Sequence, residues 1–123
     1  MEKIKCICVM RELFEALSVL ESGLLVTHGV SLNEAMVLCS IGKEKVTASM
    51  VVERTGMTAS HASKVIRSAE VKKLLVRELG DKDKRQMHFT LTPLGISCLT
   101  GIKEQGIDIP DLLVPLFKDA IRK

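Results

Sequence analysis

The chain has 123 residues, of which 46% are hydrophobic and 27% are charged. These values are typical of a single folded domain and exclude disorder driven by excess net charge. Aromatic residues make up 2%, with three Phe and no Trp or Tyr, which disfavours a carbohydrate cleft, an aromatic cage or a base-stacking RNA platform. No apolar run approaches the ~18 residues of a membrane span. We expect one cytoplasmic domain over residues 1–123, with neither a membrane partner nor a signal peptide.

The net charge of +3 is unevenly distributed along the chain. Between Lys43 and Arg85 there are 11 Lys or Arg and 6 Asp or Glu, a local charge of +5. The rest of the chain has 7 Lys or Arg and 9 Asp or Glu, a charge of −2. Basic residues concentrated in one segment indicate contact with a polyanion, although a solvated surface gives the same pattern.

The four cysteines are Cys6, Cys8, Cys39 and Cys98. Their irregular spacing does not predict a disulfide framework. With three His and no second cysteine pair, the Cys6–Cys8 pair gives little support for metal binding, so we expect no metal and no cofactor. Free cysteines most often act as small buried hydrophobic residues, which we predict here, with redox sensing as the alternative.

Residues 2–22 are predicted to form an apolar helix that ends at Gly23. One apolar stripe at helical spacing consists of Ile4, Cys8, Leu13, Leu17 and Leu20. Three further residues, Ile7, Met10 and Phe14, widen it. A helix this apolar needs more cover than a small domain supplies, so we expect it to pack on a partner.

Two shorter helices follow, each with a start signal. Ser31 and Glu34 form a capping box before a helix that ends at Gly42. Thr47 is predicted to cap a helix over residues 48–54. Together these signals place two helices before residue 55.

A turn at Gly56 joins the second of these helices to a longer one, which Thr58 caps and which extends to about residue 73. Val52 is expected to pack the two helices together. The inward face of the longer helix consists of Ala62, Val65, Ile66 and Ala69. The opposite face carries Ser60, Lys64 and Arg67, flanked by His61 and Ser63. Such a face can present donors to base edges in the major groove.

A β-hairpin is predicted next, with strands over residues 74–79 and 86–91. Its charged tip and exit carry Lys82, Lys84 and Arg85, which fit the minor groove. Asp83 is expected to hold Arg77 or Arg85 in place. Thr92 and Pro93 open a helix that ends at Gly106, and a last amphipathic helix is predicted over residues 110–121.

Residues 60–95 resemble the MarR family of bacterial transcription regulators. The most specific part is the run DKRQMHFTLTPLG, in which Asp83, Lys84 and Arg85 precede an alternating strand and a Leu-Thr-x-x-Gly segment. Upstream, SLNEAMVLCSIG and VTASMVVERTGMTASHASKVI fall where that family has its helix-turn-helix. The resemblance implies a mainly α fold with a small β-hairpin wing, a winged helix-turn-helix with N- and C-terminal dimerisation helices.

The resemblance also implies a homodimer on double-stranded DNA. It places the dimerisation helices at residues 1–22 and 107–123 and the winged lobe at residues 31–105. The matched recognition-helix positions are Thr58, Ser60, His61, Ser63 and Lys64, and Arg67 adds positive charge to the same side. Arg85 matches the wing arginine and Asp83 its acidic partner. The family usually has glycine just before the first wing strand, where this chain has Lys73.

The leading hypothesis is therefore a sequence-specific DNA-binding regulator, a repressor relieved by a small-molecule effector. The first alternative is a winged helix that binds proteins without touching DNA, because a fold does not fix a function. The second is a regulator that senses oxidants through Cys6 and Cys8. An enzyme is not expected, because the sequence has no phosphate-cradling glycine loop, zinc helix or nucleophile elbow.

Overall fold

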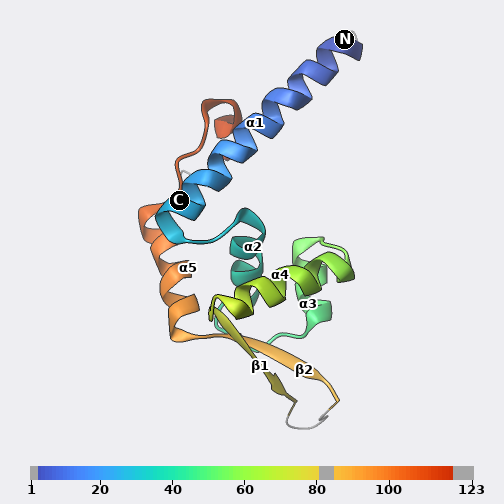
Figure 1. The fold of residues 1–123 in the computed structure, drawn as a ribbon, viewed down its shortest axis with the longest axis vertical. Helices are drawn as coiled ribbons and strands as arrows, with labels where there is room; N and C mark the ends of the chain where they lie inside the picture. Colours follow the sequence, from blue (N-terminus) through green and yellow to red (C-terminus); the bar gives the residue numbers. More distant parts are fainter. Residues whose placement is uncertain (1–2, 81–84, 118–123) are drawn as a thin grey trace.

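The computed structural model describes residues 3–80 and 85–117. The elements in chain order are α1 (Lys3–His28), α2 (Leu32–Ile41), α3 (Ala48–Thr55), α4 (Ala59–Val71), β1 (Leu75–Leu79), β2 (Met87–Leu91), α5 (Pro93–Gln105) and the 3-10 helix η1 (Asp111–Phe117). In Figure 1, α1 projects as a long arm from a lobe built by α2 to α5, and the hairpin β1–β2 extends from the opposite end. This is the predicted winged helix-turn-helix architecture.

The arm is longer than the sequence predicts, because α1 passes through Gly23 and ends at His28. An interior glycine costs a helix only about 1 kcal/mol. Continuing the helix places Leu24 in the core, where it is fully buried. The chain turns instead at Gly29, which has a φ of +75°. The predicted end at Gly23 is therefore wrong.

The buried face of α1 also differs from the predicted stripe. Ala16, Leu20 and Leu24 pack into the core, whereas Cys8 and Leu17 are exposed. The reason is geometric, since the N-terminal half of α1 lies beyond the lobe (Figure 1). Only the C-terminal part of the stripe, including Leu20, is therefore covered by the described part of its own chain.

The predicted caps are present. Ser31 N donates to Glu34 Oε1 at 2.8 Å and Glu34 N donates to Ser31 Oγ at 3.1 Å, which completes the capping box. Thr47 Oγ1 accepts from Met50 N at 3.2 Å. These bonds satisfy amide groups that a helix start leaves without a partner. They explain why the starts of α2 and α3 could be predicted from the sequence.

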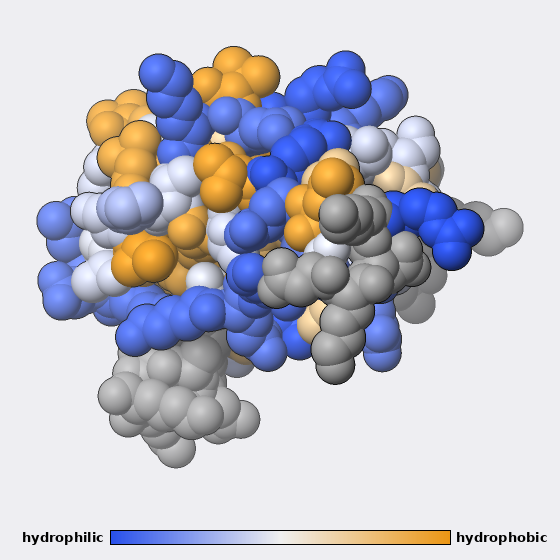
Figure 2. All heavy atoms as spheres, turned by 90° about the horizontal axis from the view of Figure 1, so that it is seen from below, coloured by the Kyte–Doolittle hydropathy of each residue, from blue (hydrophilic) through white to orange (hydrophobic). Residues whose placement is uncertain are grey.

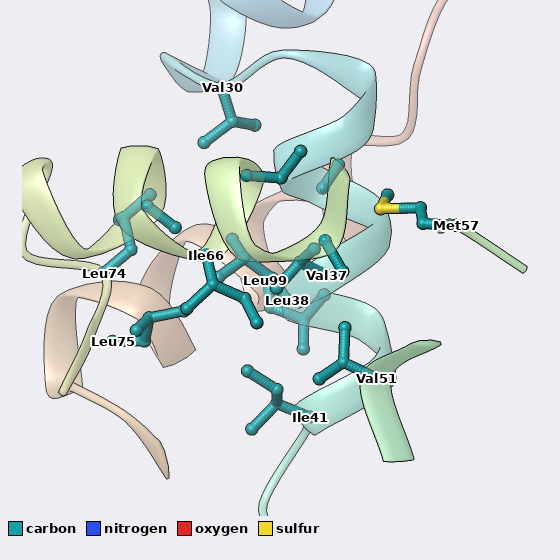
Figure 3. Packing of buried hydrophobic residues seen from close by; sticks show 14 of the residues in the cluster. Val30, Val37, Leu38, Ile41, Val51, Met57, Ile66, Leu74, Leu75 and Leu99 are labelled. Carbon is teal, nitrogen blue, oxygen red and sulfur yellow. The ribbon is translucent and has the colours of Figure 1, made fainter. Parts of the chain in front are cut away.

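The core lies where α2, α3, α4, α5 and the base of the hairpin meet (Figure 3). The four inward residues predicted for α4 are all buried. Val51 of α3 is fully buried, whereas Val52 is half-buried and packs at the edge of the core. The residue that packs α3 onto α4 most deeply is thus the neighbour of the predicted one.

The hairpin is antiparallel, with Leu75 opposite Leu91 and Leu79 opposite Met87. Val46 adds a third backbone segment that the sequence did not predict: its N–H donates to Phe89 O at 3.0 Å, and Phe89 N donates back to Val46 O at 2.7 Å. A single residue pair of this kind has no alternating pattern to reveal it. It ties the connection between α2 and α3 to β2.

The C-terminal segment is a 3-10 helix, not the predicted amphipathic α-helix. Pro115 lies inside it, and proline both lacks an amide donor and clashes with an α-helical turn. η1 packs against α1, where Leu113 is buried. Residues 118–123, the rest of the predicted helix, lie outside the described residues.

Among the described residues, no single helix is long and apolar enough to cross a membrane. Of the helices described, only the pair Lys5–His28 and Leu32–Ile41, counted together, has the length and composition of a span, and the two helices meet at a bend of 66°.

Candidate nucleic-acid interface

The turn between α3 and α4 sets the direction of the exposed helix. Gly56 has a φ of +77°, a left-handed conformation that L side chains rarely adopt, and its N–H donates to Val52 O at 2.9 Å. Met57 is buried directly after it. Thr58 then caps α4 by accepting from His61 N at 3.1 Å. The Thr58 oxygen that was predicted to face DNA is therefore already engaged in the cap.

The outward face of α4 has the predicted composition. Ser60, His61, Ser63, Lys64 and Arg67 are all exposed. Four of them line a shallow depression of about 280 Å³: Ser60, Ser63, Lys64 and Arg67. The structure thus gathers two hydroxyls and two cations on one exposed surface of α4, and the two positive charges favour an anionic partner.

Figure 2 shows the molecule from the wing end, the lower end of Figure 1. Hydrophilic residues cover much of this face, with separate hydrophobic residues between them. Such a face is not an uninterrupted apolar surface. Its composition fits a polar, charged partner better than a hydrophobic one.

Arg77 joins the wing to α4. Its Nε and Nη2 donate to Glu70 Oε2 and Oε1, both at 2.8 Å, and its guanidinium lies 5.5 Å from the centre of the Phe89 ring. The hydrogen bond from Arg77 holds the pKa of Glu70 below its ordinary value. Glu70 was not predicted as a partner, since it lies on a different element; Asp83, the predicted one, lies outside the described residues.

The base of the wing tip is closed by Gly80 N, which donates to Gln86 O at 2.8 Å. Arg85 is exposed beside this closure. Lys82 and Lys84, the other predicted wing cations, lie outside the described residues. Arg85 is thus the predicted DNA-contacting cation of the wing whose position the structure describes.

Two polar contacts around α4 were missed from the sequence. Asn33 Nδ2 donates to His61 Nε2 at 3.4 Å, which brings the start of α2 beside the recognition face. Lys72 Nζ donates to Glu34 Oε1 at 2.7 Å. The sequence marked Glu34 only as a cap, because no local pattern reveals a partner 38 residues away.

The cysteines differ from expectation. Cys6, Cys8 and Cys39 are exposed, so the prediction that they are buried is wrong; Cys98 is half-buried. Partial desolvation of the thiol raises the pKa of Cys98 and also that of Cys39, although Cys39 as a whole residue is exposed. A raised pKa disfavours the reactive thiolate. Within residues 3–80 and 85–117, no group of three or more His, Cys, Asp or Glu could hold a metal ion.

A largely apolar cavity of about 610 Å³ lies between the base of α1, α2, α3 and α5. Leu24 and Ile102 line it from α1 and α5, and Met36 and Cys39 line it from α2. Arg54 stands at its wall, where it donates to Ser40 O and Glu44 Oε2, both at 2.7 Å. The cavity lies away from the outward face of α4.

Solved structures with the same fold are numerous. BldR from Sulfolobus solfataricus is 19% identical, with a TM-score of 0.67 over 97% of this chain and 87% of that one. BpsR from Bordetella bronchiseptica, whose DNA binding is regulated by 6-hydroxynicotinic acid, is 19% identical, with a TM-score of 0.66 over 84% and 77%. MepR from S. aureus, in complex with DNA, is 18% identical, with a TM-score of 0.62 over 78% and 80%.

No curated protein matches the sequence. The model of the MarR family matches residues 28–86. This segment runs from the last residue of α1 through α2, α3, α4 and β1 and ends just before β2. Over this segment, which is slightly less than half of the chain, the sequence matches the MarR family.

Proposed function

We propose that the chain binds double-stranded DNA sequence-specifically as a homodimer and represses transcription until a small molecule releases it. The observation that carries the proposal is the exposed face of α4, held by the Gly56 turn and flanked by the wing. The match of residues 28–86 to a family of transcription regulators supports DNA binding. The absence of an enzymatic role stays a prediction.

In this proposal, α4 lies in the major groove and the wing in the adjacent minor groove. Lys64 and Arg67 reach bases or phosphates, while Ser60, His61 and Ser63 contribute shorter contacts. Arg85 enters the minor groove from the wing, with Lys82 and Lys84 expected beside it. Arg77 supports the wing through Glu70 and does not itself contact DNA. The MepR complex with DNA supports this assignment by similarity of fold.

The exposed apolar residues of the arm support a homodimer. Ile7 and Phe14 of α1 are 69% and 71% exposed, and Leu116 of η1 is 78% exposed. Apolar surface of this extent marks an interface more often than a free surface. We place the dimerisation surface on α1 and on the segment after Gly106. The winged lobe between them, residues 31–105, carries the DNA contacts.

The cavity beside α2 supports the proposal that a small molecule regulates the protein. Its volume of about 610 Å³ lies in the range that small-molecule sites occupy. Its apolar lining, without an aromatic residue among those described, fits an aliphatic or small ring compound. The regulation of BpsR by 6-hydroxynicotinic acid is a precedent within this fold.

The test is a binding selection from fragmented host DNA with excess nonspecific competitor at physiological salt. We expect an inverted repeat with half-sites about 10–10.5 bp apart. Lys64→Ala should weaken binding to that site at least about tenfold, whereas Lys103→Ala, on α5, should not. Recovery of no site, or equal binding by both variants, would contradict the proposal and favour the protein-interaction alternative.

A further inference from the structure

A buried carboxylate lies where the arm, α2 and the recognition helix meet. Glu34 is 3% exposed. It accepts from Ser31 N at 2.8 Å, from Lys72 Nζ at 2.7 Å and from the Ser68 hydroxyl. Lys72 Nζ also donates to Gly29 O, at 3.1 Å. We call these five residues, Gly29, Ser31, Glu34, Ser68 and Lys72, the corner clasp.

The clasp exceeds what a helix cap requires. Capping of α2 needs only the exchange between Ser31 and Glu34. The contacts to Ser68 and Lys72 come from the last turn and the C-cap of α4, more than 30 residues further along the chain. They join the end of the recognition helix to the corner that follows α1.

The carboxylate is held in its charged form. Burial raises the pKa of Glu34, but the hydrogen bonds from Lys72, Ser68 and Ser31 outweigh it, so the pKa lies below its ordinary value. No buried side-chain polar atom in the described part of the chain lacks a hydrogen-bond partner. A satisfied, ionic contact of this kind permits one geometry, whereas apolar surfaces can slide.

Other contacts of the arm lead to different elements. α1 packs against η1 and α5, and Glu21 Oε2 accepts from Leu32 N at 3.0 Å, which ties the arm to α2. Cys98 Sγ of α5 donates to His28 O at 3.6 Å. The bond from Lys72 to Gly29 is the contact that joins the end of α4 to the end of α1 directly.

We propose that Glu34 and Lys72 are positioning residues for DNA recognition, which fix the angle between the arm α1 and the recognition helix α4. The inference rests on the proposed dimeric function, because arms that join two copies would translate this angle into the distance between two recognition helices. A fixed angle selects one spacing between half-sites. Loss of the clasp should let the same helices accept several spacings.

Three variants separate positioning from stability. Lys72→Met leaves the buried carboxylate without its cation and should lower Tm by about 5 °C or more. Glu34→Gln keeps a side chain that completes a capping box. The double variant removes both charges, so its Tm should return close to that of the wild type, because no unpaired buried charge remains. Glu104→Gln is the control, since it removes an exposed carboxylate of α5 that belongs neither to the clasp nor to the lining of the proposed effector cavity.

The first measurement needs no DNA. Spin labels carried by non-cysteine side chains replace Ser18 on α1 and Ser63 on α4, both exposed, and labelled chains are diluted with unlabelled ones. We expect a narrow distance distribution in the wild type and in the control. The double variant should show about a twofold greater width at near-wild-type Tm. A width equal to that of the wild type would overturn the proposal.

The second measurement repeats the DNA selection with the double variant. One spacer length should dominate for the wild type and the control, and several neighbouring lengths for the double variant. The same single spacer for all three would overturn the positioning role while leaving the proposed function intact. If the wild type selects no DNA, the proposed function fails, and the label distances alone decide whether the clasp fixes the angle.

Discussion

Lys73 occupies a backbone conformation that suits glycine better. Its φ is +63°, in the left-handed region, where a side chain costs roughly 1–2 kcal/mol. Two hydrogen bonds hold the backbone in this conformation. Leu74 N donates to Ala69 O at 3.0 Å, and the Thr92 hydroxyl donates to Lys73 O at 2.7 Å. Glycine is also the residue expected here from the family resemblance. The end of α4 is therefore strained at a single position.

Lys73→Gly should raise the free energy of unfolding by about 0.5–1 kcal/mol, because relief of strain exceeds the added flexibility of the unfolded chain. Urea unfolding at pH 7 measures the difference. Lys103→Gly, inside α5, should lower the same quantity by about 1 kcal/mol. A loss of stability for both variants would mean that Lys73 is not strained.

Gly95 is required for a different reason, since a Cβ built there lies 2.0 Å from Leu74 O. Leu74 O is a backbone atom and the position of a Cβ is fixed by its own backbone, so neither atom can rotate away. Gly95→Ala should therefore destabilise the fold by at least about 2 kcal/mol. Gly101→Ala is the matched control on the same helix, because its Cβ would meet His28 Nδ1 at an ordinary 3.8 Å. Thermal unfolding of both variants checks the contrast, and equal Tm values would contradict it.

Glu34 also predicts a pH dependence. Its pKa is lowered in the folded state, so its contribution to stability is complete above the unfolded-state pKa of about 4.3 and is lost as the pH falls through the folded-state value. Glu34→Gln should show a smaller loss of stability between pH 6 and pH 3 than the wild type. Urea midpoints across this range test it, and parallel curves would contradict it.

At the scale of elements, the ion pair between Arg77 and Glu70 links β1 to α4. Arg77→Gln should lower DNA affinity several-fold by loosening the wing, while the slope of affinity against salt stays the same, because no phosphate contact is lost. Arg85→Ala should instead reduce that slope by about one. Binding measured at several salt concentrations separates the two effects. A reduced slope for the Arg77 variant would show that it contacts DNA itself.

The elements that could be predicted are those encoded by neighbouring residues. Ser31, Thr47 and Thr58 sit next to the helices they cap, and the inward face of α4 repeats at the helical period. The outward face of α4 follows from the same period. The exposed polar face of α4, on which the proposed DNA contacts lie, could therefore be predicted from one segment of the chain.

What could not be predicted depends on residues that are distant in sequence. The end of α1 is decided by the burial of Leu24, which outweighs the weak helix propensity of Gly23. The bridge from Val46 to Phe89 and the pairing of Arg77 with Glu70 join separate elements. Local patterns carry no signal for such contacts, so the sequence predicted the exposed face of α4 but not the contacts that hold it in place.

At the scale of the whole molecule, the arm carries the prediction of a dimer. Phe14 is largely exposed on α1, and burying such a side chain contributes about 1.5–3 kcal/mol. Phe14→Glu removes one phenyl side chain from each of the two chains of the proposed dimer. It should therefore raise the dissociation constant of the dimer at least about a hundredfold. Analytical ultracentrifugation measures this, with Lys103→Glu as the control. Unchanged dissociation in the Phe14 variant would remove α1 from the interface.

The length of the arm has a mechanical consequence. Twenty-six residues of α-helix extend roughly 39 Å. Over that length a tilt of only about 5° moves the free end by about 3.4 Å, which is one base-pair step along DNA. A change of a few degrees at the corner at Gly29 is therefore amplified along the arm to the length of a base-pair step. In the proposed dimer, a slight loosening at this corner would therefore be enough to move the two α4 helices out of register with their half-sites, without a large rearrangement.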